Sequence, residues 1–140
     1  MTTSEEERIV RSAVAAAADL PREVIASIGD ARTLELLGAT TTLAILKKYR
    51  DKPGPQQISE FADELKFRFP DAADHIKPIV IEALVRFAFG EQDILDGISS
   101  DDLQTVLFML PYAIISEENI YGEPLDAFVA EVVAAVNAEE

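Results

Sequence analysis

Residues 78–90 read PIVIEALVRFAFG, and this stretch decides the fold more than any other part of the sequence. From Ile79 to Phe89 apolar side chains follow one another so closely that they would cover nearly every side of a helix. Such a helix belongs in the interior of a protein. Pro78 suits the start of a helix but would kink one already under way, and Gly90 is a natural end. We therefore expect a central helix over Ile79–Phe89, with a start or a kink at Pro78.

The segments on both sides of this helix repeat apolar residues at helical spacing. Before it, Ile58, Phe61 and Leu65 recur every three or four residues. After it, Ser99 is a suitable cap for a further apolar helix, which Pro111 would kink or break. Because no segment alternates apolar and polar residues in the manner of a strand, the sequence predicts an all-α fold.

Four more helix starts are indicated by a capping residue or a proline, at Ser4, Pro21, Asp30 and Pro124. The helix after Asp30 is weakened by a glycine and three threonines, so a break near Ala39 is expected. The prediction is a single compact bundle of six to eight helices. The chain of 140 residues has the usual length of one domain and shows no long linker, so we expect one domain over residues 1–140.

Composition excludes several kinds of protein. The sequence contains no cysteine, which rules out disulfides, thiolate metal sites and a cysteine nucleophile. Its longest stretch without charge, residues 103–116, is shorter than the roughly 20 apolar residues of a membrane span. The acidic start, with three glutamates after Ser4, lacks the basic flank of a secretory signal peptide. We expect a cytoplasmic protein that does not enter a membrane.

His75 is the one histidine, and it follows Asp71 by four residues, so the two could share a helix face and transfer protons. Bundle di-iron sites and hydrolytic metal sites require more histidines. Glycine-rich phosphate loops and the usual hydrolase motifs are absent from the sequence. The loops around Gly97 and Gly122 are acidic, but they lack the ligand spacing of an EF-hand. We predict no catalytic residue, no metal and no cofactor.

Charge is the uneven feature of this sequence. The chain has 26 acidic and 12 basic residues, for a net charge of -14. The first 86 residues hold 14 acids and all 12 bases, whereas the last 54 hold 12 acids and no lysine or arginine. The acids after Arg86 must therefore face water, pair with bases from the first part, or await a partner. Direct nucleic-acid binding is not expected, because a chain this acidic repels nucleic acid.

These observations favour a non-enzymatic, acidic protein–protein interaction module that docks a basic partner surface through its C-terminal part, alone or as a homodimer. One alternative is a helical bundle that binds a small molecule or is catalytic. Another is an inhibitor that mimics nucleic acid and occupies a DNA-binding protein. The carboxylates expected to contact the partner are Asp101, Asp102, Glu117, Glu118, Glu123 and Asp126.

Overall fold

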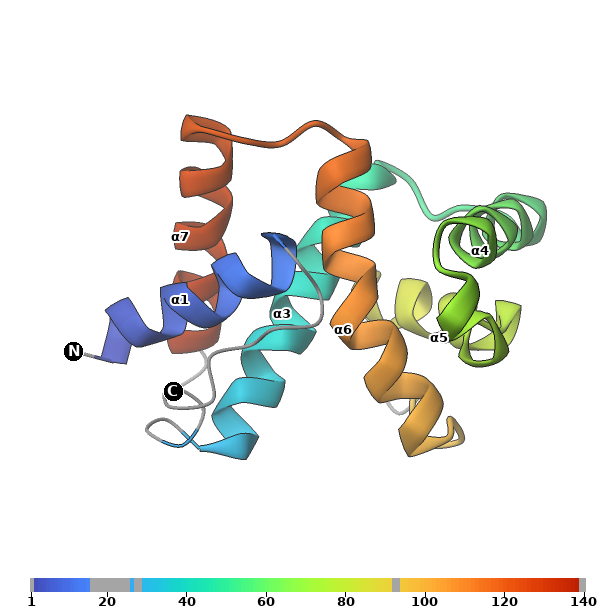
Figure 1. Cartoon of the computed structure of the whole chain (residues 1–140), viewed down its shortest axis with the longest axis horizontal. Coiled ribbons are helices and arrows are strands. Elements are labelled where there is room, and N and C mark those ends of the chain that lie inside the picture. The colour runs from blue at the N-terminus through green and yellow to red at the C-terminus, as the bar shows by residue number, and fades with distance from the viewer. Residues whose placement is uncertain (1, 16–25, 27–28, 92–93, 139–140) are drawn as a thin grey trace. The chain divides into compact units, whose positions relative to one another are not determined.

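The computed structural model describes residues 2–15, 26, 29–91 and 94–138 (Figure 1). Within these ranges the chain forms seven helices and no strand, which confirms the all-α prediction. The helix expected at Pro21 lies outside the described residues. None of the described helices is long and apolar enough to cross a membrane. The helices are α1 (Thr2–Ala15), α3 (Asp30–Lys48), α4 (Pro55–Arg68), the 3-10 helix η1 (Pro70–His75), α5 (Pro78–Ala88), α6 (Ser100–Glu117) and α7 (Glu123–Ala138).

Tertiary contacts divide the chain into two compact units. Unit 1 consists of Met1–Ala44 and Leu107–Glu140, and unit 2 is the continuous segment Ile45–Val106. The chain passes from one unit to the other within α3 and again within α6. The expectation of one domain over residues 1–140 stays a prediction.

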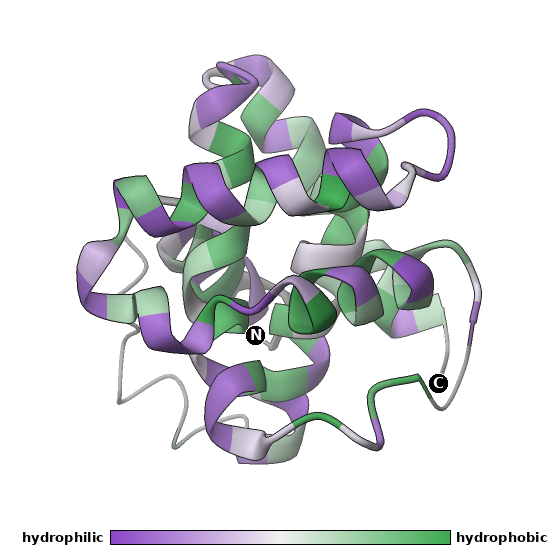
Figure 2. Cartoon of the chain, turned by 90° about the vertical axis from the view of Figure 1, so that its right-hand side faces the viewer, coloured by the Kyte–Doolittle hydropathy of each residue, from purple (hydrophilic) through white to green (hydrophobic). Residues whose placement is uncertain are grey.

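In unit 1, α1 packs against α7. Ile9 and Val10 of α1 are fully buried, as are Val129 and Val132 of α7, and Phe128 is almost so. These positions recur at helical spacing, so each helix turns one apolar stripe inward. Figure 2 shows apolar and polar residues alternating along the helices. Burial of such stripes is the main stabilising contribution to the unit.

Helix α3 runs without interruption through the threonine run, so the predicted break near Ala39 was wrong. Thr40 and Thr41 are buried, and each side-chain hydroxyl donates a hydrogen bond to the carbonyl four residues earlier in the same helix. The hydroxyls are satisfied inside the helix, and a buried polar group that is hydrogen-bonded carries little cost. Sequence propensity alone overestimated how strongly these threonines would disturb the helix.

In unit 2, α4 contacts both η1 and α5. Pro78 is the first residue of α5 and follows an extended Lys77, so the proline begins the helix and does not kink it. The buried residues of α5 are Val80, Ile81, Ala83, Leu84 and Val85. Ile79 and Phe87 are exposed, so the prediction of burial on nearly every side was wrong for part of this helix.

Helix α6 continues through Pro111, so the proline does not break the helix, and the alternative of a kink there stays a prediction. Proline has no N–H to donate to the carbonyl four residues earlier, but packing holds the helix together, since Pro111, Leu110 and Ile114 are all buried. The helix begins at Ser100, directly after the predicted cap Ser99. Apolar burial therefore outweighs the loss of one backbone hydrogen bond.

Candidate functional site

Four of the six carboxylates that the sequence analysis singled out lie on either side of one turn in unit 1. Glu117 is the last residue of α6 and Glu118 follows it, while Glu123 and Asp126 lie in the first turn of α7. All four residues are exposed. We call Glu117, Glu118 and Glu123 the acidic turn.

The backbone of this turn is held in a defined conformation. Asn119 has a φ of 54° and Gly122 a φ of 64°, both in the left-handed region that glycine and asparagine adopt most readily. The Ile120 N–H donates to the Ile115 carbonyl at 3.1 Å, which closes the end of α6. Tyr121 lies between Asn119 and Gly122 and is 72% exposed. The turn therefore presents an aromatic ring among carboxylates.

Asp126, in the first turn of α7, has a basic partner on α1. Arg11 of α1 reaches it, with Nη2 2.9 Å from Oδ1. Both side chains are well exposed, so water screens the pair and it adds little to stability. The pair nevertheless neutralises part of the charge of Asp126, so this carboxylate attracts a basic partner less strongly than the exposed Glu118 and Glu123 do.

Asp101 and Asp102 lie in unit 2, at the opposite end of α6 from the acidic turn. Asp101 is exposed, whereas Asp102 is buried and paired. Lys77 Nζ donates to Asp102 Oδ2 at 2.9 Å, and His75 Nδ1 lies 2.9 Å from Asp102 Oδ1. Asp102 therefore offers little of its carboxylate to a partner.

The surroundings of Asp102 stabilise its charged form. The hydrogen bond from Lys77 contributes most, the one with His75 comes next, and together they lower the pKa of the Asp102 carboxyl against the opposing effect of burial. The sequence paired His75 with Asp71, four residues away, but the structure pairs it with a carboxylate 27 residues away. No local pattern could have indicated a contact between residues so far apart in sequence.

A second acid from the C-terminal part also meets bases from the first part. Arg86 donates two hydrogen bonds to Glu91, from Nε to Oε2 at 2.8 Å and from Nη2 to Oε1 at 2.7 Å. Lys52 Nζ donates to Oε2 at 2.9 Å. The hydrogen bond from Arg86 has the largest effect and the one from Lys52 the next, and together they lower the pKa of Glu91 to about 2. Some of the acids after Arg86 are thus paired within the chain.

The Glu91 pairing predicts a specific dependence of stability on pH. Because the folded-state pKa of Glu91 lies below its ordinary value of 4.5, the contribution of this group is fully present above that value and is lost as pH falls toward about 2. Urea unfolding at a series of pH values should show a smaller loss of stability between pH 4.5 and 2 in Glu91→Gln than in the wild-type protein. The exposed Asp96→Asn variant is the control and should follow the wild type. If Glu91→Gln also follows the wild type, the pairing does not stabilise the fold.

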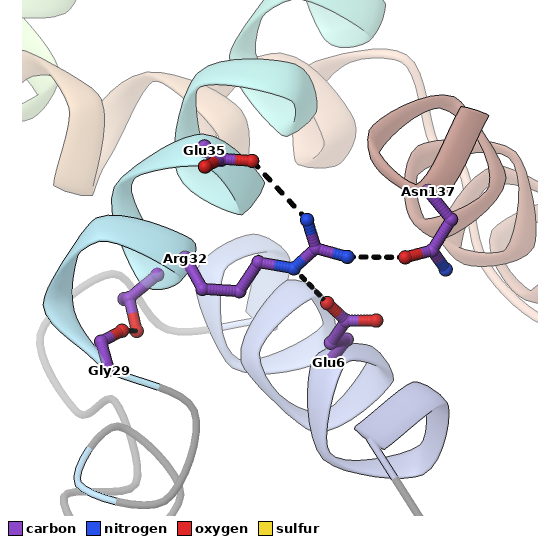
Figure 3. A network of polar contacts seen from close by, with 6 residues as sticks. Glu6, Gly29, Arg32, Glu35 and Asn137 are labelled. Carbon is purple, nitrogen blue, oxygen red and sulfur yellow. Dashed lines mark hydrogen bonds and ion pairs between the residues drawn. The ribbon is translucent and has the colours of Figure 1, made fainter. Parts of the chain in front are cut away.

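Unit 1 contains a polar network that the sequence analysis missed (Figure 3). Arg32 of α3 donates from Nε to Glu6 of α1 and from Nη2 to the side-chain carbonyl of Asn137 of α7. A weaker contact joins its Nη1 to Glu35 at 3.3 Å. The network ties three helices together. A signal was present in the sequence, since Glu6 precedes the buried Ile9 and Val10 by three and four residues and so shares their helix face.

The division into units changes how the charge is distributed. Counted over the sequence, unit 1 has 14 acids and 4 bases, a net charge of -10, whereas unit 2 has 12 acids and 8 bases, a net charge of -4. Both ends of the chain contribute to the acidity of unit 1. The acidic turn therefore belongs to the more negative of the two units.

Neither a search for metal-binding clusters nor the comparison with known proteins assigns a role to these residues. The part of the chain that the structure describes has no group of three or more histidine, aspartate or glutamate side chains placed to hold a metal ion. No protein family, curated protein or solved structure shows a significant match to the chain.

Proposed function

We propose that the protein is an acidic helical interaction module that docks a basic protein surface through the acidic turn. The observation that carries this proposal is the exposure of Glu117, Glu118 and Glu123 on both sides of the exposed Tyr121. Complementary charge speeds association and selects the partner, and tyrosine is enriched among residues that dominate binding energy. In this proposal the module acts in the cytoplasm, as a monomer or a homodimer.

The electrostatic setting of the turn supports the same proposal. Glu118 and Glu123 have no ion-pair partner among the described residues, and unit 1 carries a net charge of -10. A surface of this kind attracts cations over a distance of about 8–10 Å at ordinary salt concentration. Docking should therefore weaken as salt is added.

The test removes the three charges of the acidic turn while keeping side-chain size. The variant is Glu117→Gln, Glu118→Gln, Glu123→Gln, and it should retain a basic partner from a lysate of the source cells about tenfold less than wild type, as quantitative mass spectrometry measures. The reason is the loss of three attractive contacts at the rim of the interface. Binding by the wild type should also fall between low and moderate salt.

The matched control removes three exposed carboxylates from α4 in unit 2, in the variant Glu60→Gln, Asp63→Asn, Glu64→Gln. It changes the net charge by the same amount, so it should bind as the wild type does if the position of the charge matters. Equal loss in both triple variants would show that net charge alone drives the binding. No loss in the acidic-turn variant would rule out the turn as the docking surface.

Native mass spectrometry of protein purified from its source cells separates this function from the alternative of a small-molecule-binding bundle. A retained small molecule would support the alternative, and a retained basic protein would support docking. If the retained protein is a DNA-binding protein that the module displaces from DNA, the module acts as a nucleic-acid mimic.

A further inference from the structure

The imidazole of His75 in unit 2 is held from one side. Its Nδ1 lies 2.9 Å from Oδ1 of Asp102, a side chain that is only 10% exposed. The other carboxylate oxygen is held by Lys77 Nζ at 2.9 Å. Since both oxygens are engaged, the carboxylate is fixed in place and in turn fixes the orientation of the ring.

The same contacts determine which ring nitrogen carries the hydrogen of the neutral imidazole. An ionised carboxylate can only accept a hydrogen bond, so Nδ1 must donate. The lowered pKa of Asp102 keeps this carboxylate ionised well into the acidic range. Nε2 is then the nitrogen with the lone pair. Among the described residues nothing hydrogen-bonds to Nε2, and the His75 side chain is 40% exposed, so solutes can reach it.

We propose that His75 is an acyl-transfer site, at which Nε2 takes the acyl group of an activated ester and passes it to water. The Nε2 lone pair attacks the ester carbonyl carbon, the carbon–oxygen bond to the leaving group breaks, and the alcohol part departs as its anion. Water then adds to the acyl-imidazolium, the carbon–nitrogen bond breaks, and the carboxylic acid leaves with the Nε2 lone pair restored. The proton that the water gives up neutralises the alcohol anion. Asp102 holds the Nδ1 hydrogen throughout and is a positioning residue.

The charges around His75 select the substrate class. Asp71 and Asp74 on η1 and Asp101 on α6 are exposed carboxylates within a few residues of the pair, while the ammonium of Lys77 is engaged with Asp102. Anionic esters are repelled by this surrounding, so the substrates are neutral or cationic esters. The site lies in a different unit from the acidic turn and adds a chemical activity to the proposed docking function.

The test uses the full chain and 4-nitrophenyl acetate as the neutral ester, with N-acetylhistidine amide as the reference imidazole. The second-order rate constant of the wild type should exceed that of the reference by about tenfold or more, because the ring is preorganised. His75→Gln should lose this reaction, and Asp102→Asn should fall to about the level of the reference. Asp63→Asn makes the same chemical change at an exposed site and should react as the wild type does. A cationic ester should react faster than an anionic one.

Nitrogen-15 NMR of the single histidine provides a second measurement, which does not depend on reaction rates. Neutral His75 of the wild type should be protonated on Nδ1, and in Asp102→Asn the population should shift toward Nε2–H. Circular dichroism establishes that each variant is folded before its rate is compared. A wild-type rate equal to that of N-acetylhistidine amide, or a neutral wild-type ring protonated on Nε2, would overturn the proposal.

Discussion

Replacing Arg32 with methionine is expected to destabilise the protein by about 3–5 kcal/mol, because the buried carboxylate of Glu6 loses its cation. The Glu6 side chain is only 3% exposed, so water cannot take over the role of the guanidinium. The same change removes the hydrogen bond to Asn137, and with it the polar link among α1, α3 and α7 (Figure 3). Urea unfolding followed by circular dichroism measures the effect.

Two further variants isolate the cause of this loss. Glu35 also contacts Arg32, but it is exposed, so Glu35→Ala should change stability by no more than about 0.5 kcal/mol. Combining Glu6→Leu with Arg32→Met removes both charges and should recover part of the stability, because an apolar pair avoids the unpaired buried charge. If Arg32→Met costs no more than Glu35→Ala, the buried pair does not hold unit 1 together.

The positions of most helices could be predicted from the sequence because their signals are local. Helix α4 begins at Pro55, and the Gln57 side chain accepts a hydrogen bond from the Gly54 N–H at 3.0 Å. Helix α7 begins at Glu123, one residue before the predicted start at Pro124. Caps and prolines act within one turn of a helix, so the residues that decide these boundaries are neighbours in the sequence.

Predictions of breaks were less successful because they depend on packing. The threonine run of α3 and Pro111 of α6 both have low helix propensity, yet both helices continue through them. Each propensity cost is at most a few kcal/mol, and burial of neighbouring apolar side chains exceeds it. These two free-energy terms cannot be compared from the sequence alone, because the sequence does not show which side chains will be buried.

The candidate site was only partly predictable for the same reason. Exposure of Glu117, Glu118 and Glu123 follows from charge, and the sequence places them near one another. The burial of Asp102 beside His75 depends on a contact across 27 residues, which charge counting cannot reveal. The sequence placed the acidity after Arg86, whereas the fold joins acids from both ends of the chain in unit 1.

Replacing Phe61 with alanine is expected to destabilise the protein by about 3–5 kcal/mol, since the variant loses apolar burial and leaves a cavity. Phe61 is 3% exposed, its ring meets Tyr49 edge-on at a centroid distance of 6.2 Å, and Lys48 Nζ lies 4.6 Å from the ring centre. The contacts join the end of α3 to α4 inside unit 2. Urea unfolding provides the free energy.

Phe67 on the same helix is the matched control. It follows the buried Leu65 by two residues, which turns it about 200° away from the buried stripe, and it is 89% exposed. Phe67→Ala makes the same chemical change and the same gain in helix propensity, so the difference between the two variants isolates tertiary burial. We expect Phe67→Ala to change stability by no more than about 0.5 kcal/mol. Equal losses in the two variants would mean that α4 packs through a face other than that of Ile58, Phe61 and Leu65.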